Sequence, residues 1–92
     1  MTTHNLVTLS STEDTLLSPN GVHSGVNISI QNVNASGYIY LGGEGVTTSD
    51  YGFRLAVGNA ISFELDALDS IYAVSQTNGL YAAVIITTLA EL

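Results

Sequence analysis

The stretch Val26-Asn-Ile-Ser-Ile-Gln31 decides the fold class of this chain, because apolar and polar side chains alternate strictly along it. That alternation is typical of a strand with one face in a hydrophobic core and the other in solvent. The same period of two recurs at 61–66, in the order Ile-Ser-Phe-Glu-Leu-Asp. The two stretches together predict a β protein.

Further strands follow from short runs that are rich in β-branched and aromatic residues. These runs are Leu6–Leu9, Tyr38–Leu41, Ile71–Val74 and Leu80–Leu89. The last run is apolar on both faces at its start, which predicts a central or interface strand buried on both sides there. Turn pairs separate the runs, among them Asn20-Gly21 and Asn78-Gly79. This rhythm predicts an all-β fold, a compact antiparallel β-sandwich or jelly-roll-like small barrel of about seven to eight short strands.

The first twenty residues differ from the rest, because a polar and acidic segment follows Leu6–Leu9 and Pro19 closes it. One interpretation is a first strand plus a loop. The other is an N-terminal arm that adds a strand to a neighbouring molecule. Ser10-Ser-Thr-Glu13 also has the spacing of a helix capping box, with room for little more than one turn. We therefore divide the chain into residues 1–20, an arm or first strand with an acidic loop, and 21–92, the β-sandwich domain.

The charge composition excludes several classes of function. The 92 residues include eight Asp or Glu, a single Lys or Arg and no Cys, with a formal net charge of −7. One arginine cannot neutralise a nucleic-acid backbone, and anionic lipids would repel the chain, so we expect neither nucleic acid nor membrane as a partner. The longest apolar run, Leu80–Ile86, is far shorter than a membrane span of about 18–20 residues, and no secretion signal is visible. Synthesis in a cytoplasm is the default expectation.

The sequence offers little for catalysis or metal binding. It has no Cys or Lys nucleophile and no Gly-x-Ser-x-Gly elbow, and only His4 and His23 could act as bases. Glu64, Asp66 and Asp69 are the best metal candidates, but the segment lacks the pivoting glycine of a calcium loop. A solvated acidic edge explains them better. We expect no catalytic site, no metal and no cofactor.

Tyrosines and the lone arginine are the better candidates for binding. Exposed aromatic side chains can stack on a sugar or anchor a protein interface, although core packing accounts for many of them. Arg54 stands among eight acidic residues and is expected to pair with one of them, within the chain or between chains.

The central part of the chain resembles a recurring pattern of small structural proteins of tailed bacteriophages. Its segments lead from a Tyr-Ile-Tyr-Leu-Gly-Gly strand through a Val-Thr-Thr-Ser turn and a glycine loop to an Ile-Tyr-Ala-Val strand. The likeness covers about two thirds of the chain, from Val26 to Ile86. The matching segments are Val26–Asn32, Gly37–Gly43, Val46–Ser49, Gly52–Leu55, Val57–Phe63 and Ile71–Ser75.

The resemblance implies a β-sandwich on a virion and brings no catalytic residues. We therefore expect a non-enzymatic capsid decoration (cement) protein that binds the outside of a phage head and stabilises it through multivalent contacts. Its expected partners are the major capsid protein and copies of itself, with a trimer favoured, and its place is the capsid exterior. The alternative is a carbohydrate- or receptor-binding module of a tail fibre or baseplate. The expected interface residues are Leu6, Val7, Leu9, Tyr38, Tyr40, Tyr51 and Arg54.

Overall fold

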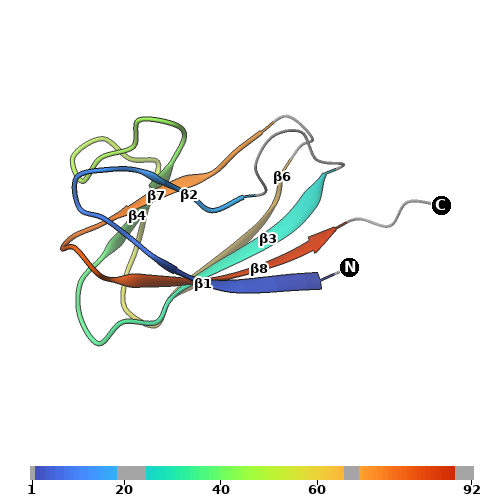
Figure 1. The fold of residues 1–92 in the computed structure, drawn as a ribbon, viewed down its shortest axis with the longest axis horizontal. Coiled ribbons are helices and arrows are strands. Elements are labelled where there is room, and N and C mark those ends of the chain that lie inside the picture. Colours follow the sequence, from blue (N-terminus) through green and yellow to red (C-terminus); the bar gives the residue numbers. More distant parts are fainter. Residues whose placement is uncertain (1, 19–24, 66–68, 89–92) are drawn as a thin grey trace.

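A computed structural model describes residues 2–18, 25–65 and 69–88 of the chain, and these residues form eight strands (Figure 1). Their order is β1 (Thr2–Thr8), β2 (Thr15–Leu16), β3 (Val26–Asn32), β4 (Ile39–Gly42), β5 (Phe53–Leu55), β6 (Ala60–Leu65), β7 (Tyr72–Ser75) and β8 (Tyr81–Thr88). No helix occurs in the described ranges, and hence none there that is long and apolar enough to cross a membrane.

The strands form two antiparallel four-stranded sheets that pack face to face. The first sheet has the order β1-β8-β3-β6 and the second has the order β2-β7-β4-β5. Every connection passes from one sheet to the other except the one between β4 and β5, which are paired neighbours in the second sheet. This is the strand order of an eight-stranded jelly roll. The predicted β-sandwich is therefore confirmed, in its jelly-roll form.

The core lies between the sheets and is built from the inward positions of the alternating strands. Ile28 and Ile30 of β3 are fully buried and pack with Ile39 and Leu41 of β4 in the second sheet. The register sets Ile28 opposite Phe63 and Ile30 opposite Ile61 on β6. Because a slip of one residue would expose this whole set, the alternation of 26–31 fixes the register.

The segment from Ser10 to Glu13 forms no helix, although its capping hydrogen bonds are present. The Ser10 hydroxyl accepts from the backbone N–H groups of Thr12 and Glu13 at 3.1 and 3.2 Å. The Ser10 carbonyl accepts from Ser75 N–H of the second sheet at 3.0 Å. The chain crosses from one sheet to the other in these few residues, so the cap closes a turn and no helix follows.

The last strand differs in one respect from the prediction. β8 is central, since it pairs with β1 on one side and β3 on the other. Its inward residues Ala82 and Val84 are buried, but Tyr81 and Ile85 on its other face are exposed. The expectation of burial on both sides is therefore wrong for the single chain, because no part of the described chain covers the outer face of this sheet.

The first segment belongs to the sandwich in this chain. β1 pairs along its whole length with β8, from Thr2 opposite Thr87 to Thr8 opposite Tyr81, so β1 begins where β8 ends (Figure 1). β2 pairs with β7 of the second sheet. In the structure this segment is a first strand plus a loop. Its donation to a neighbouring molecule stays a prediction. The predicted turn at Asn78-Gly79 is present, with Gly79 at φ 88°, and Asn20-Gly21 lies outside the described residues.

Candidate interaction surface

The outer face of the first sheet is almost free of charge. The alternation of the four strands turns polar, small and apolar side chains outward. Among the outward residues that the structure describes, only His4 and Glu64 carry an acidic or basic side chain. The outward residues are Thr2, His4, Leu6, Thr8, Asn27, Ser29, Gln31, Ala60, Ser62, Glu64, Tyr81, Ala83, Ile85 and Thr87. A face of this kind loses little hydration energy when another protein surface covers it.

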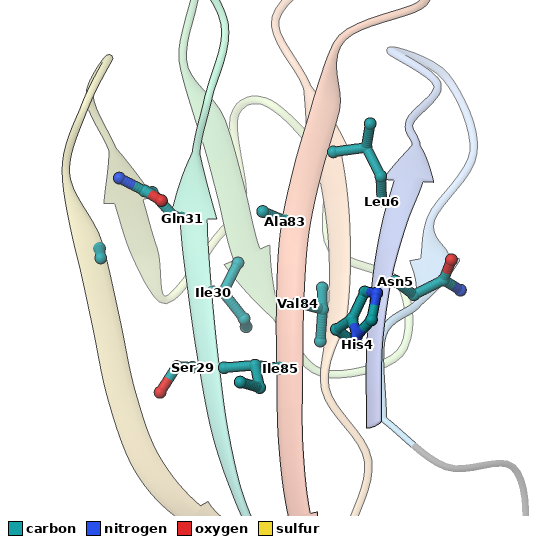
Figure 2. A pocket seen from close by; sticks show the side chains of 10 residues that line it. His4, Asn5, Leu6, Ser29, Ile30, Gln31, Ala83, Val84 and Ile85 are labelled. Carbon is teal, nitrogen blue, oxygen red and sulfur yellow. The ribbon is translucent and has the colours of Figure 1, made fainter. Parts of the chain in front are cut away.

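A shallow groove of about 380 Å³ crosses this face (Figure 2). The small side chains of Ala83, Ala60 and Ser29 leave the hollow, and Leu6 and Ile85 border it. Leu6 is 58% exposed and Ile85 is 45% exposed. We call the surface formed by these five residues the apolar groove. Exposed apolar side chains gathered around a hollow are typical of a contact site.

Beside the groove, β1 is an open edge of the sheet. Leu9 N–H donates to Leu80 O at 2.8 Å, so by alternation the N–H groups of Val7, Asn5 and Thr3 also point toward β8. The backbone groups of the even-numbered residues then point away from the sheet. The seven residues of β1 include no lysine and no proline, the usual protections of an edge strand. This edge is a template on which another strand can pair.

The outer face of the second sheet carries a cluster of tyrosines. Tyr40 is only 8% exposed, because Val46 from the loop 43–52 folds back over it. The Tyr51 ring lies 4.7 Å from the Tyr40 ring, centroid to centroid, and the guanidinium of Arg54 lies 4.5 Å above the Tyr38 ring. We call Tyr38, Tyr51, Arg54 and the loop 43–52 the tyrosine ridge.

This arrangement makes a poor sugar-stacking platform. Tyr40 is covered, and Arg54 occupies one face of the Tyr38 ring. Tyr51 is 42% exposed and packs against Tyr40. The contact found for Arg54 is with an aromatic ring, a cation–π interaction, where sequence analysis expected a carboxylate. The ion pair between chains stays a prediction.

The predicted interface residues thus divide between two opposite surfaces and the core. Leu6 borders the apolar groove, while Tyr38, Tyr51 and Arg54 form the tyrosine ridge. Val7 points inward and is half-buried. Leu9 is only 2% exposed and belongs to the core, where a partner cannot reach it.

The acidic and histidine candidates are not brought together within the described residues. No group of three or more His, Asp or Glu that could hold a metal is found there. His4 lies on β1 and Glu64 on β6, at opposite edges of the first sheet. Asp66 and His23 lie outside the described residues.

Sequence reasoning missed the groove and one buried side chain. Ala83 and Ile85 were assigned to a strand buried on both faces. In the structure these two side chains lie on the outer face of β8, and Val84 between them lies on the inner face. Asn32 is fully buried, at the inward position that follows Ile28 and Ile30. A polar residue in an inward position is the signal that could have identified it.

No model of a known protein family matches the chain, and no curated protein matches it. Among solved structures, a chain of the endospore appendages of Bacillus, described as a novel family of disulfide-linked pili, has a similar fold. The TM-score is 0.52 at 17% sequence identity, and the match covers 98% of this chain and 87% of the other. At this identity the likeness concerns the fold alone.

Proposed function

We propose that this chain is a non-enzymatic structural subunit that works by associating with copies of itself in a larger assembly. The observation that carries the proposal is the open edge of β1, seven residues long and without lysine or proline. A strand added to this edge would satisfy the outward N–H and C=O groups of Thr2, His4, Leu6 and Thr8.

The surroundings of β1 support a protein partner. The first sheet presents an almost uncharged outer face next to this edge, and Leu6 and Ile85 expose apolar surface on it. Desolvating such a surface costs little, and burying its apolar area stabilises a contact. The absence of Cys and Lys from the sequence also leaves few nucleophiles for catalysis.

The likeness of fold to a chain of Bacillus endospore pili supports a role in a fibre. Those pili are described as disulfide-linked, whereas this chain has no cysteine. An assembly of this chain would therefore be held by contacts other than disulfides. Each contact can be modest, because many copies act together.

A capsid decoration protein is the more specific form of this proposal. It is supported by the resemblance of 26–86 to phage structural proteins, and its partners would be the major capsid protein and, in the favoured trimer, two further copies. Deletion of the first seventeen residues would be a poor test, because Leu9 and Leu17 belong to the core. The better test is sedimentation of the intact chain with purified phage heads, in which co-sedimentation supports decoration and its absence leaves self-assembly as the function.

The edge of β1 can be tested by one pair of substitutions. His4→Pro removes an N–H group that points away from β8, so the pairing with β8 survives while a strand outside β1 loses a donor. His4→Ala removes the same side chain and keeps the N–H group. Light scattering should show assembly of the wild type and of His4→Ala and a clear loss for His4→Pro, with thermal unfolding confirming that both variants are folded. Equal assembly of the two variants would exclude this edge as the contact.

A further inference from the structure

Two uncovered surfaces lie on opposite faces of the sandwich. The apolar groove is on the outer face of the first sheet, and the tyrosine ridge is on the outer face of the second. Tyrosine and arginine are the residues that most often dominate the energy of protein interfaces. The ridge therefore has the composition of a contact, and the groove exposes the apolar side chains of Leu6 and Ile85. Each needs a partner of suitable shape.

The two surfaces differ in relief, since one is raised and the other is hollow. The loop 43–52 lies on top of the second sheet, since Val46 packs on Tyr40 and Val74 at outward positions, and Tyr51 stands exposed beside them. The ridge is thus raised above its sheet. On the opposite face, Ala83, Ala60 and Ser29 leave a hollow between larger neighbours.

Contacts between like surfaces are unfavourable. Ridge against ridge would bring the two acidic loops onto one contact surface, with the exposed carboxylates of Glu44 and Asp50 on both sides. Groove against groove would place one hollow on another and leave poorly packed space. The outward residues of the first sheet include a single carboxylate, Glu64. That face therefore repels an acidic loop least, and Glu64 lies outside the groove itself.

We infer that the tyrosine ridge of one copy docks in the apolar groove of the next copy. The inference rests on the proposed self-assembly and adds a face-to-face contact to the proposed pairing of strands at the edge of β1. Because the two surfaces differ and lie on opposite faces, the contact is head-to-tail and repeats, so that copies stack into an open chain or a ring. It also accounts for the uncovered outer residues of β8, which were expected to be buried.

The absence of cysteine from the sequence allows a direct test. Ala83→Cys places one thiol in the groove, and Ser49→Cys places one on the exposed loop of the ridge. Both changes are small and leave Tyr51, Arg54 and Leu6 in place. Each purified variant is treated with a short bis-maleimide, alone and in an equimolar mixture with the other, and the products are separated on a denaturing gel.

Head-to-tail docking predicts covalent dimers in the mixture and several-fold fewer with either variant alone. A chain with both substitutions should give a ladder of longer products. The matched control replaces Ser49→Cys by Val57→Cys, an exposed site on the turn between β5 and β6, and should give no dimers above background with Ala83→Cys.

The outcomes separate the inference from the proposed function. Dimers from one variant alone, at the yield of the mixture, would mean that like surfaces meet and would overturn the inference. The wild type could also assemble while the mixture of the two cysteine variants gives no more dimers than the Val57→Cys control. That result would overturn the inference and leave self-assembly intact. A wild type that stays monomeric at every concentration would overturn the proposed function itself.

Discussion

Asn32 joins three parts of the sandwich through its buried side chain. Its amide group donates to the carbonyls of Gly37 and Leu55, both at 2.9 Å. Its side-chain oxygen accepts from the backbone and side-chain N–H groups of Asn34 at 3.1 and 2.8 Å. Because every donor and acceptor of this amide has a partner, burial costs little in the native chain.

Replacing this side chain should be costly. Asn32→Ala leaves the buried carbonyl of Leu55 and the partly buried carbonyl of Gly37 without these donors, and we expect the free energy of unfolding to fall by about 2–4 kcal/mol. Asn27→Ala, at an exposed position of the same strand, should change it by less than about 0.5 kcal/mol. Urea unfolding of the two variants measures both values. A similar small effect of both substitutions would show that this network does not stabilise the fold.

At single positions, the sequence revealed the core better than the surface. Inward residues such as Ile28 and Ile30 follow directly from period two, since burial of one face requires it. The ring contacts of Tyr40 do not follow from spacing, because the loop that covers Tyr40 is placed by tertiary packing. Leu9 was assigned to an interface for a related reason: apolarity alone does not distinguish a core residue from a contact residue.

At the scale of the element, the proposed self-assembly depends on β1. It is an edge strand with one row of backbone groups bonded to β8 and the other row open. Sequence analysis identified a strand here, and left open whether it belongs to its own sheet or to a neighbour. The structure pairs β1 with β8 of its own sheet, and the other side of the strand is open to a strand of a neighbour. Whether the strand belongs to its own sheet is decided by pairing partners far along the chain, such as Thr87 for Thr2.

Hydrogen exchange of β1 should therefore alternate along the strand. In dilute protein, the amides of Asn5 and Val7 should exchange slowly and those of His4, Leu6 and Thr8 quickly, because only the first set is bonded to β8. On assembly the second set should become protected as well. Amide exchange followed by NMR before and after concentration measures this. If the even-numbered amides stay unprotected in the assembled state, copies do not pair at this edge.

For the whole molecule, the balance between repulsion and contact decides assembly. A net charge of −7 on 92 residues repels other copies, whereas both outer faces offer contacts. The fold class followed from the alternating stretches. The composition of the two outer faces did not follow from these stretches, because it depends on which strands become neighbours.

Salt should therefore promote assembly. Raising the ionic strength from about 0.01 to 0.15 M shortens the screening length from about 30 to 8 Å, which weakens repulsion between whole subunits more than it weakens short apolar contacts. We expect the mean mass in light scattering to rise over this range. A fall in mass would mean instead that ion pairs of Arg54, the single Lys or Arg of the sequence, dominate the contact.

The most direct test of self-assembly is the native mass of the intact chain, measured by sedimentation velocity from micromolar to millimolar concentration. The proposal predicts species heavier than one chain of 9.6 kDa, growing with concentration. A single species of 9.6 kDa at every concentration would contradict it.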